Sequence, residues 1–237
     1  DGSVFCCSKL TETDETIVTQ PLTIAFDNAE WRPYRRNDSG WTLAKPQSFK
    51  IVYEMRGAGA VFAPVAGVAY LIVAQLTGEG GVILRGEGTL RFQSDAYHFT
   101  GPCRAEKGTI DLSSAGTLRN AKFGGGAGTI SGATLDGATF ALTADDDWNV
   151  AETPTFADCS ISGMLRIDFG RDETRPLDEA KLPALITIGK WTGSGAKPTK
   201  AKVVGTGGHR LSGNVTVDED GNILLEAFRS GICIIVR

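Results

Sequence analysis

The stretch GEGTLRF at residues 86–92 decides the fold, because its Gly-Thr-apolar triplet returns twice further along the chain. The triplet GTL at residues 88–90 is followed by GTI at residues 108–110 and by GTI at residues 128–130, a constant spacing of 20 residues. Glycine before each threonine suits a corner, since it tolerates backbone conformations that other residues avoid. The unit that repeats is therefore a turn followed by a short strand.

Charged and apolar residues alternate within this unit. Leu90 and Phe92 flank Arg91, and Ile110 and Leu112 flank Asp111. Successive strand residues point to opposite faces, so the alternation directs apolar groups inward and charges outward. A 20-residue repeat of short strands is typical of a solenoid whose coils stack at about 4.8 Å. We therefore predict an all-β fold with a β-solenoid centre.

Related triplets occur between and after these three, namely GTL at residues 116–118, ATL at 133–135 and ATF at 138–140. An antiparallel sandwich or barrel also has short strands separated by frequent turns. Periodicity leaves that alternative open.

The same residues resemble a known repeat. GEGTLRF at residues 86–92, FTG at 99–101 and GTIDL at 108–112 are similar to the autotransporter-associated β-strand repeat, found in passenger regions of bacterial surface and secreted proteins. The resemblance implies a right-handed parallel β-helix, export, and a place on or outside a bacterial cell. It implies no catalytic residues. Nothing in the chain resembles the C-terminal membrane barrel of an autotransporter.

The flanking regions differ from the repeat. Strand-like runs at residues 22–26 and 48–53 precede it, and one helix of about two turns is expected between Leu177 and Leu185, ended by Pro183. The run DEDGN at residues 218–222 predicts a hairpin among antiparallel C-terminal strands that cap the solenoid. We therefore divide the chain into an N-terminal β segment at residues 1–56, a β-solenoid at 57–170 and a C-terminal β cap at 171–237.

Composition excludes some classes of protein. The chain has 237 residues, 24 basic and 28 acidic, for a net charge of −4, so it lacks the positive charge of a nucleic-acid-binding protein. Residues 57–78 carry no charge, but Pro64 and several glycines interrupt them, which favours two buried strands over a membrane span. No basic segment precedes an apolar one at the start, so the chain is either already processed or never exported.

Five cysteines, an odd number, leave at least one thiol without a partner in the chain. Cys6 and Cys7 lie near one end, and Cys233 lies between Ile232 and Ile234 in an apolar terminal run. These residues predict head-to-tail self-association through strand edges or intermolecular bridges. Buried free cysteines with one internal bridge are the alternative.

Catalytic motifs are absent from the sequence. His98 and His209 are far apart, and His98 is expected in a turn. Asp145–Asp147 lack calcium-loop spacing and are expected to be a solvated loop. Cleavage of a glycan needs two carboxyl groups close together. Asp111, Asp136 and Asp168 are candidates on outward positions, but the residue expected beside Asp111 on the next coil is Ser131, which is not an acid. We expect no catalytic residue, metal site or cofactor.

Aromatic and cationic residues gather in one polar loop. It contains Trp31, Arg32, Tyr34, Arg35 and Trp41. Aromatic platforms with polar neighbours suit a sugar face or a protein interface. Packing of the tryptophans beneath their own loop is the alternative.

The function predicted from these features is a non-catalytic structural or adhesion protein, extracellular or on a bacterial cell surface, that self-assembles head-to-tail into fibres or a surface layer. A carbohydrate-binding or host-adhesion module is the first alternative, with surface glycans as partners. A polysaccharide-cleaving enzyme is the second.

Overall fold

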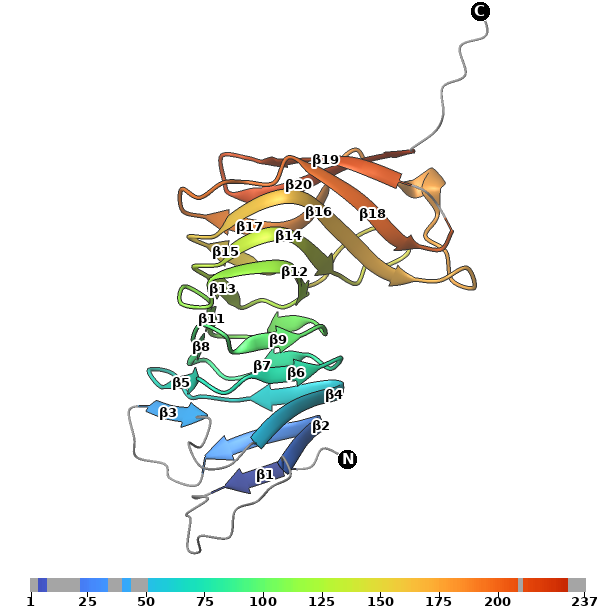
Figure 1. Ribbon diagram of the computed structural model, residues 1–237. Coiled ribbons are helices and arrows are strands. Elements are labelled where there is room, and N and C mark those ends of the chain that lie inside the picture. The colour runs from blue at the N-terminus through green and yellow to red at the C-terminus, as the bar shows by residue number, and fades with distance from the viewer. Residues whose placement is uncertain (1–3, 8–21, 34–39, 44–50, 209–210, 230–237) are drawn as a thin grey trace, which may run out of the picture.

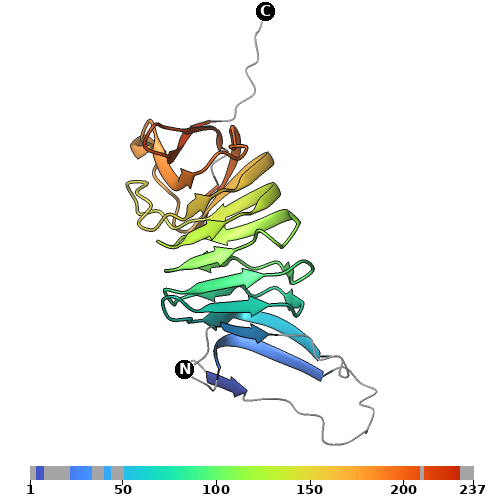
Figure 2. The same ribbon diagram turned by 90° about the vertical axis from the view of Figure 1, so that its left-hand side faces the viewer.

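The computed structural model describes residues 4–7, 22–33, 40–43, 51–208 and 211–229. These residues form strands throughout, apart from loops and one 3-10 turn at Glu179–Lys181. The strands stack along one long direction, from β1 near the N-terminus to β18, β19 and β20 at the other end (Figures 1 and 2). The predicted all-β class is confirmed.

Most strands pair in parallel, and the pairing forms three ladders. The first ladder contains β3 (Gly40–Leu43), β5 (Ala69–Ile72), β8 (Thr89–Phe92), β11 (Thr109–Asp111), β13 (Thr129–Ser131), β15 (Thr155–Ala157) and β17 (Ile186–Thr192). In it Thr89, Thr109 and Thr129 lie side by side. The 20-residue spacing is therefore the register of the sheet.

The second ladder runs beside the first. It contains β1 (Val4–Cys7), the second halves of β2 (Leu22–Pro33) and β4 (Ile51–Phe62), β7 (Val82–Leu84), β10 (Cys103–Ala105), the second halves of β12 (Thr117–Gly124), β14 (Thr134–Ala141) and β16 (Ser160–Arg171), and β18 (Lys200–Thr206).

The third ladder consists of the first halves of these long strands. The first half of β2 pairs with the first half of β4, which pairs with β6 (Leu76–Gly78), and β6 pairs with β9 (Tyr97–Phe99). The first halves of β12, β14 and β16 pair with one another. The triplets at residues 116–118 and 133–135 belong here, because Thr117 pairs with Thr134. Triplets that look alike in the sequence thus lie in different ladders.

The third ladder is interrupted between β9 and β12, which share no backbone pairing. Phe99 is buried, but the residue 20 positions later is the exposed Arg119, and the buried side chain is Leu118. A strand has a period of two, so this slip of one residue would set inward positions against outward ones. A cleft of about 400 Å³ separates the two strands, with His98 and Lys122 among its lining residues.

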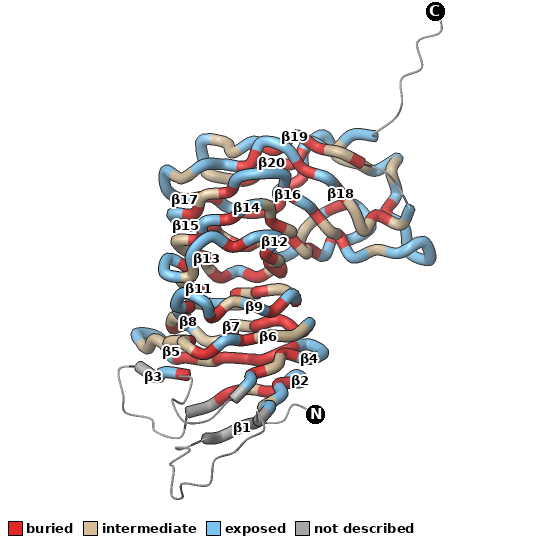
Figure 3. Tube along the Cα trace, in the orientation of Figure 1, coloured by how far each residue is buried: buried red, intermediate tan, exposed pale blue. Residues whose placement is uncertain are grey.

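Apolar side chains fill the interior between the ladders. Figure 3 shows buried and exposed residues alternating along the strands. Phe140 and Phe156 stack with ring centroids 4.7 Å apart, and Phe123 meets Phe156 edge-on at 5.6 Å. At the corner before β11, Gly108 has φ +59°, and a Cβ there would lie 2.3 Å from the carbonyl oxygen of Gly88. Close stacking of consecutive turns therefore requires glycine at this position.

The C-terminal strands are antiparallel. β18 pairs with β19 (Leu211–Val217), β19 with β20 (Asn222–Arg229), and β20 with β17. They therefore join the second ladder to the first across one end of the stack. The predicted hairpin is confirmed between β19 and β20, where Gly221 has φ +81° and Asp218 accepts a hydrogen bond from the backbone N–H of Asn222.

Two local predictions differ from the structure. The helix expected between Leu177 and Leu185 is wrong, because only Glu179–Lys181 form a 3-10 turn, with the Asp178 carboxylate accepting from the N–H of Ala180. Pro183 stops helix beyond Leu182. Residues 57–78 contain the end of β4, all of β5 and β6, and an exposed turn at Val65, and no helix in the described ranges is long and apolar enough to cross a membrane.

The long, mostly parallel, unclosed sheet is compatible with a β-solenoid. β4 and β16 run through positions 56/57 and 170/171, so backbone pairing continues across both of the predicted domain boundaries. The division into three parts stays a prediction.

Candidate functional site

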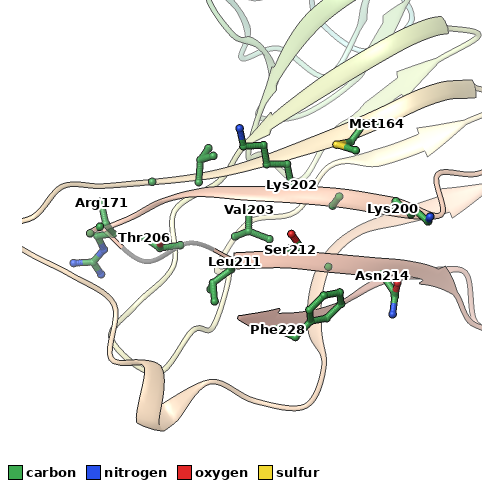
Figure 4. A pocket seen from close by; sticks show the side chains of 16 residues that line it. Met164, Arg171, Lys200, Lys202, Val203, Thr206, Leu211, Ser212, Asn214 and Phe228 are labelled. Atoms are coloured by element: carbon green, nitrogen blue, oxygen red, sulfur yellow. The ribbon is translucent and has the colours of Figure 1, made fainter. Parts of the chain in front are cut away.

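A groove of about 910 Å³ lies on the outer face of β16, β18, β19 and β20. Its lining includes Met164, Lys200, Lys202, Asn214 and Phe228 (Figure 4). Alternation positions these side chains: Ala201, Val203 and Leu211 point into the core, and the lysines between or opposite them point out.

Strand register brings the outward residues into rows. Arg166 of β16 lies opposite Lys202 of β18, which lies opposite Ser212 of β19 and then Phe228 of β20. Lys202, Ser212 and Phe228 line the groove, and Arg166 lies beside it on β16, two residues from the lining residue Met164. Two cations therefore lie on adjacent strands, whose backbones are about 4.8 Å apart. A hydroxyl group and an aromatic ring follow them on the next two strands.

Many charges elsewhere on the stack form ion pairs with residues of a neighbouring strand or loop. Arg91 Nε donates to Asp111 at 2.7 Å, and Arg85 Nε donates to Glu106 at 3.1 Å. Further pairs are Arg104–Glu152, Lys107–Glu87, Arg119–Asp136, Arg171–Asp146 and Lys181–Asp147. Within the described ranges Arg166, Lys200 and Lys202 form no ion pair. The groove thus presents positive charge that the stack does not use.

Exposed apolar groups adjoin these cations. Met164 is 61% exposed and Phe228 is 44% exposed, although most large apolar side chains of the chain are buried. Asn214 donates from its side-chain amide to Glu226 at 3.1 Å. The arrangement can therefore contact an anionic group, hydrogen-bonding groups and an apolar face of one ligand at the same time.

The structure places the predicted aromatic loop only in part. Trp31 is 5% exposed and packs against Phe62 and Tyr70, with ring centroids 5.8 Å and 5.1 Å away, as the packing alternative expects. Arg32 lies in β2, and Trp41 lies in β3 opposite Tyr70, but their side chains are not described. Tyr34 and Arg35 lie outside the described residues. Binding at this loop stays a prediction.

The predicted self-association residues lie at the margins of the described chain. Cys6 and Cys7 are in β1, opposite Arg32 and Pro33 of β2. Ile232, Cys233 and Ile234 lie outside the described residues.

The two central cysteines are buried free thiols. Burial raises the pKa of Cys159 to about 11 and raises the pKa of Cys103 further. A thiol that stays protonated is a poor nucleophile, so both act as small apolar core residues.

The three outward carboxylates lie in three different ladders. Asp111 is beside Arg91 and Ser131, Asp136 is in the third ladder opposite Ser162, and Asp168 is in the second opposite Val204. The prediction that Ser131 lies beside Asp111 is confirmed.

Asp111 also shows how these acids are used. Burial alone would raise its pKa, but hydrogen bonds from Ser113 and Arg91 outweigh burial, and its pKa lies below the usual value. The carboxylate is therefore held ionised in a structural contact.

The acidic run before Trp148 forms a turn. Asp145 accepts hydrogen bonds from the backbone N–H of Asp147 and from Asn149, while Asp146 and Asp147 pair with Arg171 and Lys181. Hydrogen bonds from the Asn149 side chain and backbone lower the pKa of Asp145. Among the described residues no group of three acidic, histidine or cysteine side chains is arranged to hold a metal ion.

The two histidines are separate in the structure as well. His98 lies on strand β9, not in a turn as expected, and contacts Asp95 at 2.7 Å. The turn prediction was wrong because β9 is held by pairing with β6. His209 lies outside the described residues.

Sequence reasoning missed the groove. The alternation of Lys200 and Lys202 with Ala201 and Val203 was a signal for an outward basic face. The position of Arg166 beside Lys202 depends on a pairing across a long connection, which the sequence does not specify.

Three comparisons with known proteins found no match: no family model, no curated protein and no solved structure is similar to the chain at the significance required.

Proposed function

We propose that the chain is a non-catalytic structural or adhesion scaffold of an extracellular or bacterial cell-surface protein, folded as a right-handed parallel β-helix. The observation that carries the proposal is the side-by-side stacking of Thr89, Thr109 and Thr129 in one parallel ladder. A parallel ladder is compatible with the β-helix that the resemblance of residues 86–112 to the autotransporter-associated repeat implies, and export rests on that resemblance alone.

The state of the outward carboxylates supports a non-catalytic role. A glycan-cleaving site needs two carboxyl groups facing one bond, about 5 to 10 Å apart. Asp111, Asp136 and Asp168 lie in separate ladders, and Asp168 accepts a hydrogen bond from the N–H of Gly170. Each contributes to local structure.

Head-to-tail assembly receives less support. β18 and β19 are paired along both edges, so these two strands offer no edge to a second copy. Assembly through Ile232–Ile234 or the terminal cysteines stays a prediction, which negative-stain microscopy of reduced and non-reduced protein tests.

The experiment for the proposed function combines location and chemistry. Protease added to intact producing cells should digest the protein, and purified protein should release no reducing ends from a panel of polysaccharides. Protection from protease until the cells are lysed, together with absence from the culture medium, would contradict the surface role. Turnover of any glycan would contradict the non-catalytic role.

A further inference from the structure

We propose that the groove on β16, β18, β19 and β20, together with the cations beside it on β12 and β16, binds an acidic polysaccharide, a glycan with carboxylates on successive sugars. The inference rests on the proposed surface role and names its ligand class.

The cations follow the stacking direction. Lys122 of β12 and Arg166 of β16 both pair with Thr139 of β14, one on each side, and Lys202 follows Arg166 on β18. Parallel strands are about 4.8 Å apart, so the three cations form a line that spans four strands. A linear polyanion lying along the stack would meet them in turn.

This line of like charges lowers the stability of the unbound protein. Like charges opposite each other destabilise a sheet, and Arg166 lies directly opposite Lys202. Asp168 and Glu226 lie nearby, but among the described residues neither forms an ion pair with these cations; Asp168 accepts from the N–H of Gly170, and Glu226 accepts from Asn214. A bound carboxylate would supply a counter-charge in direct contact with the cations.

The groove favours a glycan over an extended peptide. A peptide that joins a sheet needs a free strand edge, and both edges of β18 and β19 are occupied. The ligand must therefore be recognised by side chains alone. Ser212 and Asn214 supply hydrogen-bonding groups, and the exposed ring of Phe228 supplies an apolar face for a sugar ring.

The test is calorimetric titration of the full chain with oligogalacturonate at low salt. The fully methyl-esterified oligomer, which has the same backbone without charge, and poly-glutamate are the matched ligands. We expect oligogalacturonate to bind and both others to bind at least tenfold more weakly. Equal binding of the ester would overturn the role of the cations, and equal binding of poly-glutamate would overturn the assignment to a glycan.

Variants locate the site. Each exposed ion pair contributes little, so the double variant R166T/K202T, which removes two of them, should bind oligogalacturonate roughly tenfold more weakly. The control K190T/K197T removes two exposed lysines that lie outside both the groove and the line of Lys122, Arg166 and Lys202, and it should stay within about twofold of the native affinity. A melting temperature of R166T/K202T that is unchanged or raised shows that the variant is folded, and unchanged affinity in that folded variant would overturn the site.

The two proposals fail separately. A protein that is exposed on intact cells but does not bind oligogalacturonate contradicts only the ligand assignment. Binding by a protein that stays protected inside cells contradicts the surface role instead.

Discussion

Two regions of the molecule differ in the charges that lie on adjacent strands. One is the stack around β8, β11 and β13, and the other is the outer face of β16, β18, β19 and β20. In the stack, Arg91 and Asp111 sit on adjacent strands and pair at 2.7 Å. On the outer face, Arg166 and Lys202 sit on adjacent strands and carry the same sign. The comparison teaches that register brings two charges together but that their signs decide whether the cross-strand pair stabilises the fold, and our ligand proposal rests on the like-charged pair.

The largest expected effect lies inside the stack. Phe156 is fully buried between Phe123 and Phe140, so F156A should lower the free energy of unfolding by about 3–5 kcal/mol. Urea titration measures the loss. F228A removes the same side chain from the groove, where it is 44% exposed, and should cost about 1 kcal/mol or less. Equal losses would remove the distinction between the two regions.

Next is the corner before β11. Gly108 has positive φ and a close carbonyl neighbour, so G108A combines backbone strain with a clash and should cost about 2–3 kcal/mol in thermal unfolding. Gly116 has φ +75° but no atom within 4 Å of an added Cβ. G116A therefore isolates the backbone strain, about 1 kcal/mol. If G108A costs no more than G116A, consecutive turns are not in close contact there.

A smaller effect depends on pH. The folded pKa of Asp111 lies below its unfolded value, so its contribution is present above the unfolded pKa and is lost as pH falls through the folded one. D111N should therefore lower stability by about 0.5–1 kcal/mol at pH 7 and by progressively less below about pH 4. A deficit that persists undiminished at low pH would show that charge is not the cause.

The smallest effect concerns the groove. Replacing Arg166 with threonine removes a like-charge neighbour of Lys202 and keeps a residue suited to strands. R166T should leave the melting temperature unchanged or raise it slightly, by the equivalent of about 0.5 kcal/mol or less. R91T, which breaks the pair with Asp111, should change it in the other direction. A clear loss of stability in R166T would place Arg166 among the stabilising charges.

Local pattern was sufficient to predict much of the fold. The register of Thr89, Thr109 and Thr129 follows from a fixed 20-residue spacing, and the β19–β20 hairpin follows from the turn residues 218–222. The assignment of Thr117 and Thr134 to another ladder did not follow, because small-Thr-apolar triplets are alike in every ladder. The break between β9 and β12 depends on a one-residue difference in phase, visible only once strand boundaries are known.

The candidate site was less accessible to sequence reasoning. In the sequence Trp31 lies beside cations, which indicates a binding loop, yet tertiary packing buries it against Phe62 and Tyr70. The sequence gives no sign that Arg166 and Lys202 are neighbours, because a long connection separates them in the chain. Only the pairing of β16 with β18 brings them together. A site made across strands becomes visible only with the register.

The most direct test of the stacked architecture is the measurement of scalar couplings through hydrogen bonds in the isotope-labelled protein. The structure has the N–H of Thr109 donating to the carbonyl of Gly88, and that of Thr129 to Gly108, at 3.1 and 2.9 Å. We predict couplings from these two amide nitrogens to those two carbonyl carbons. Couplings from the same amides to carbonyls in an antiparallel hairpin partner would contradict the parallel ladder and the scaffold that rests on it.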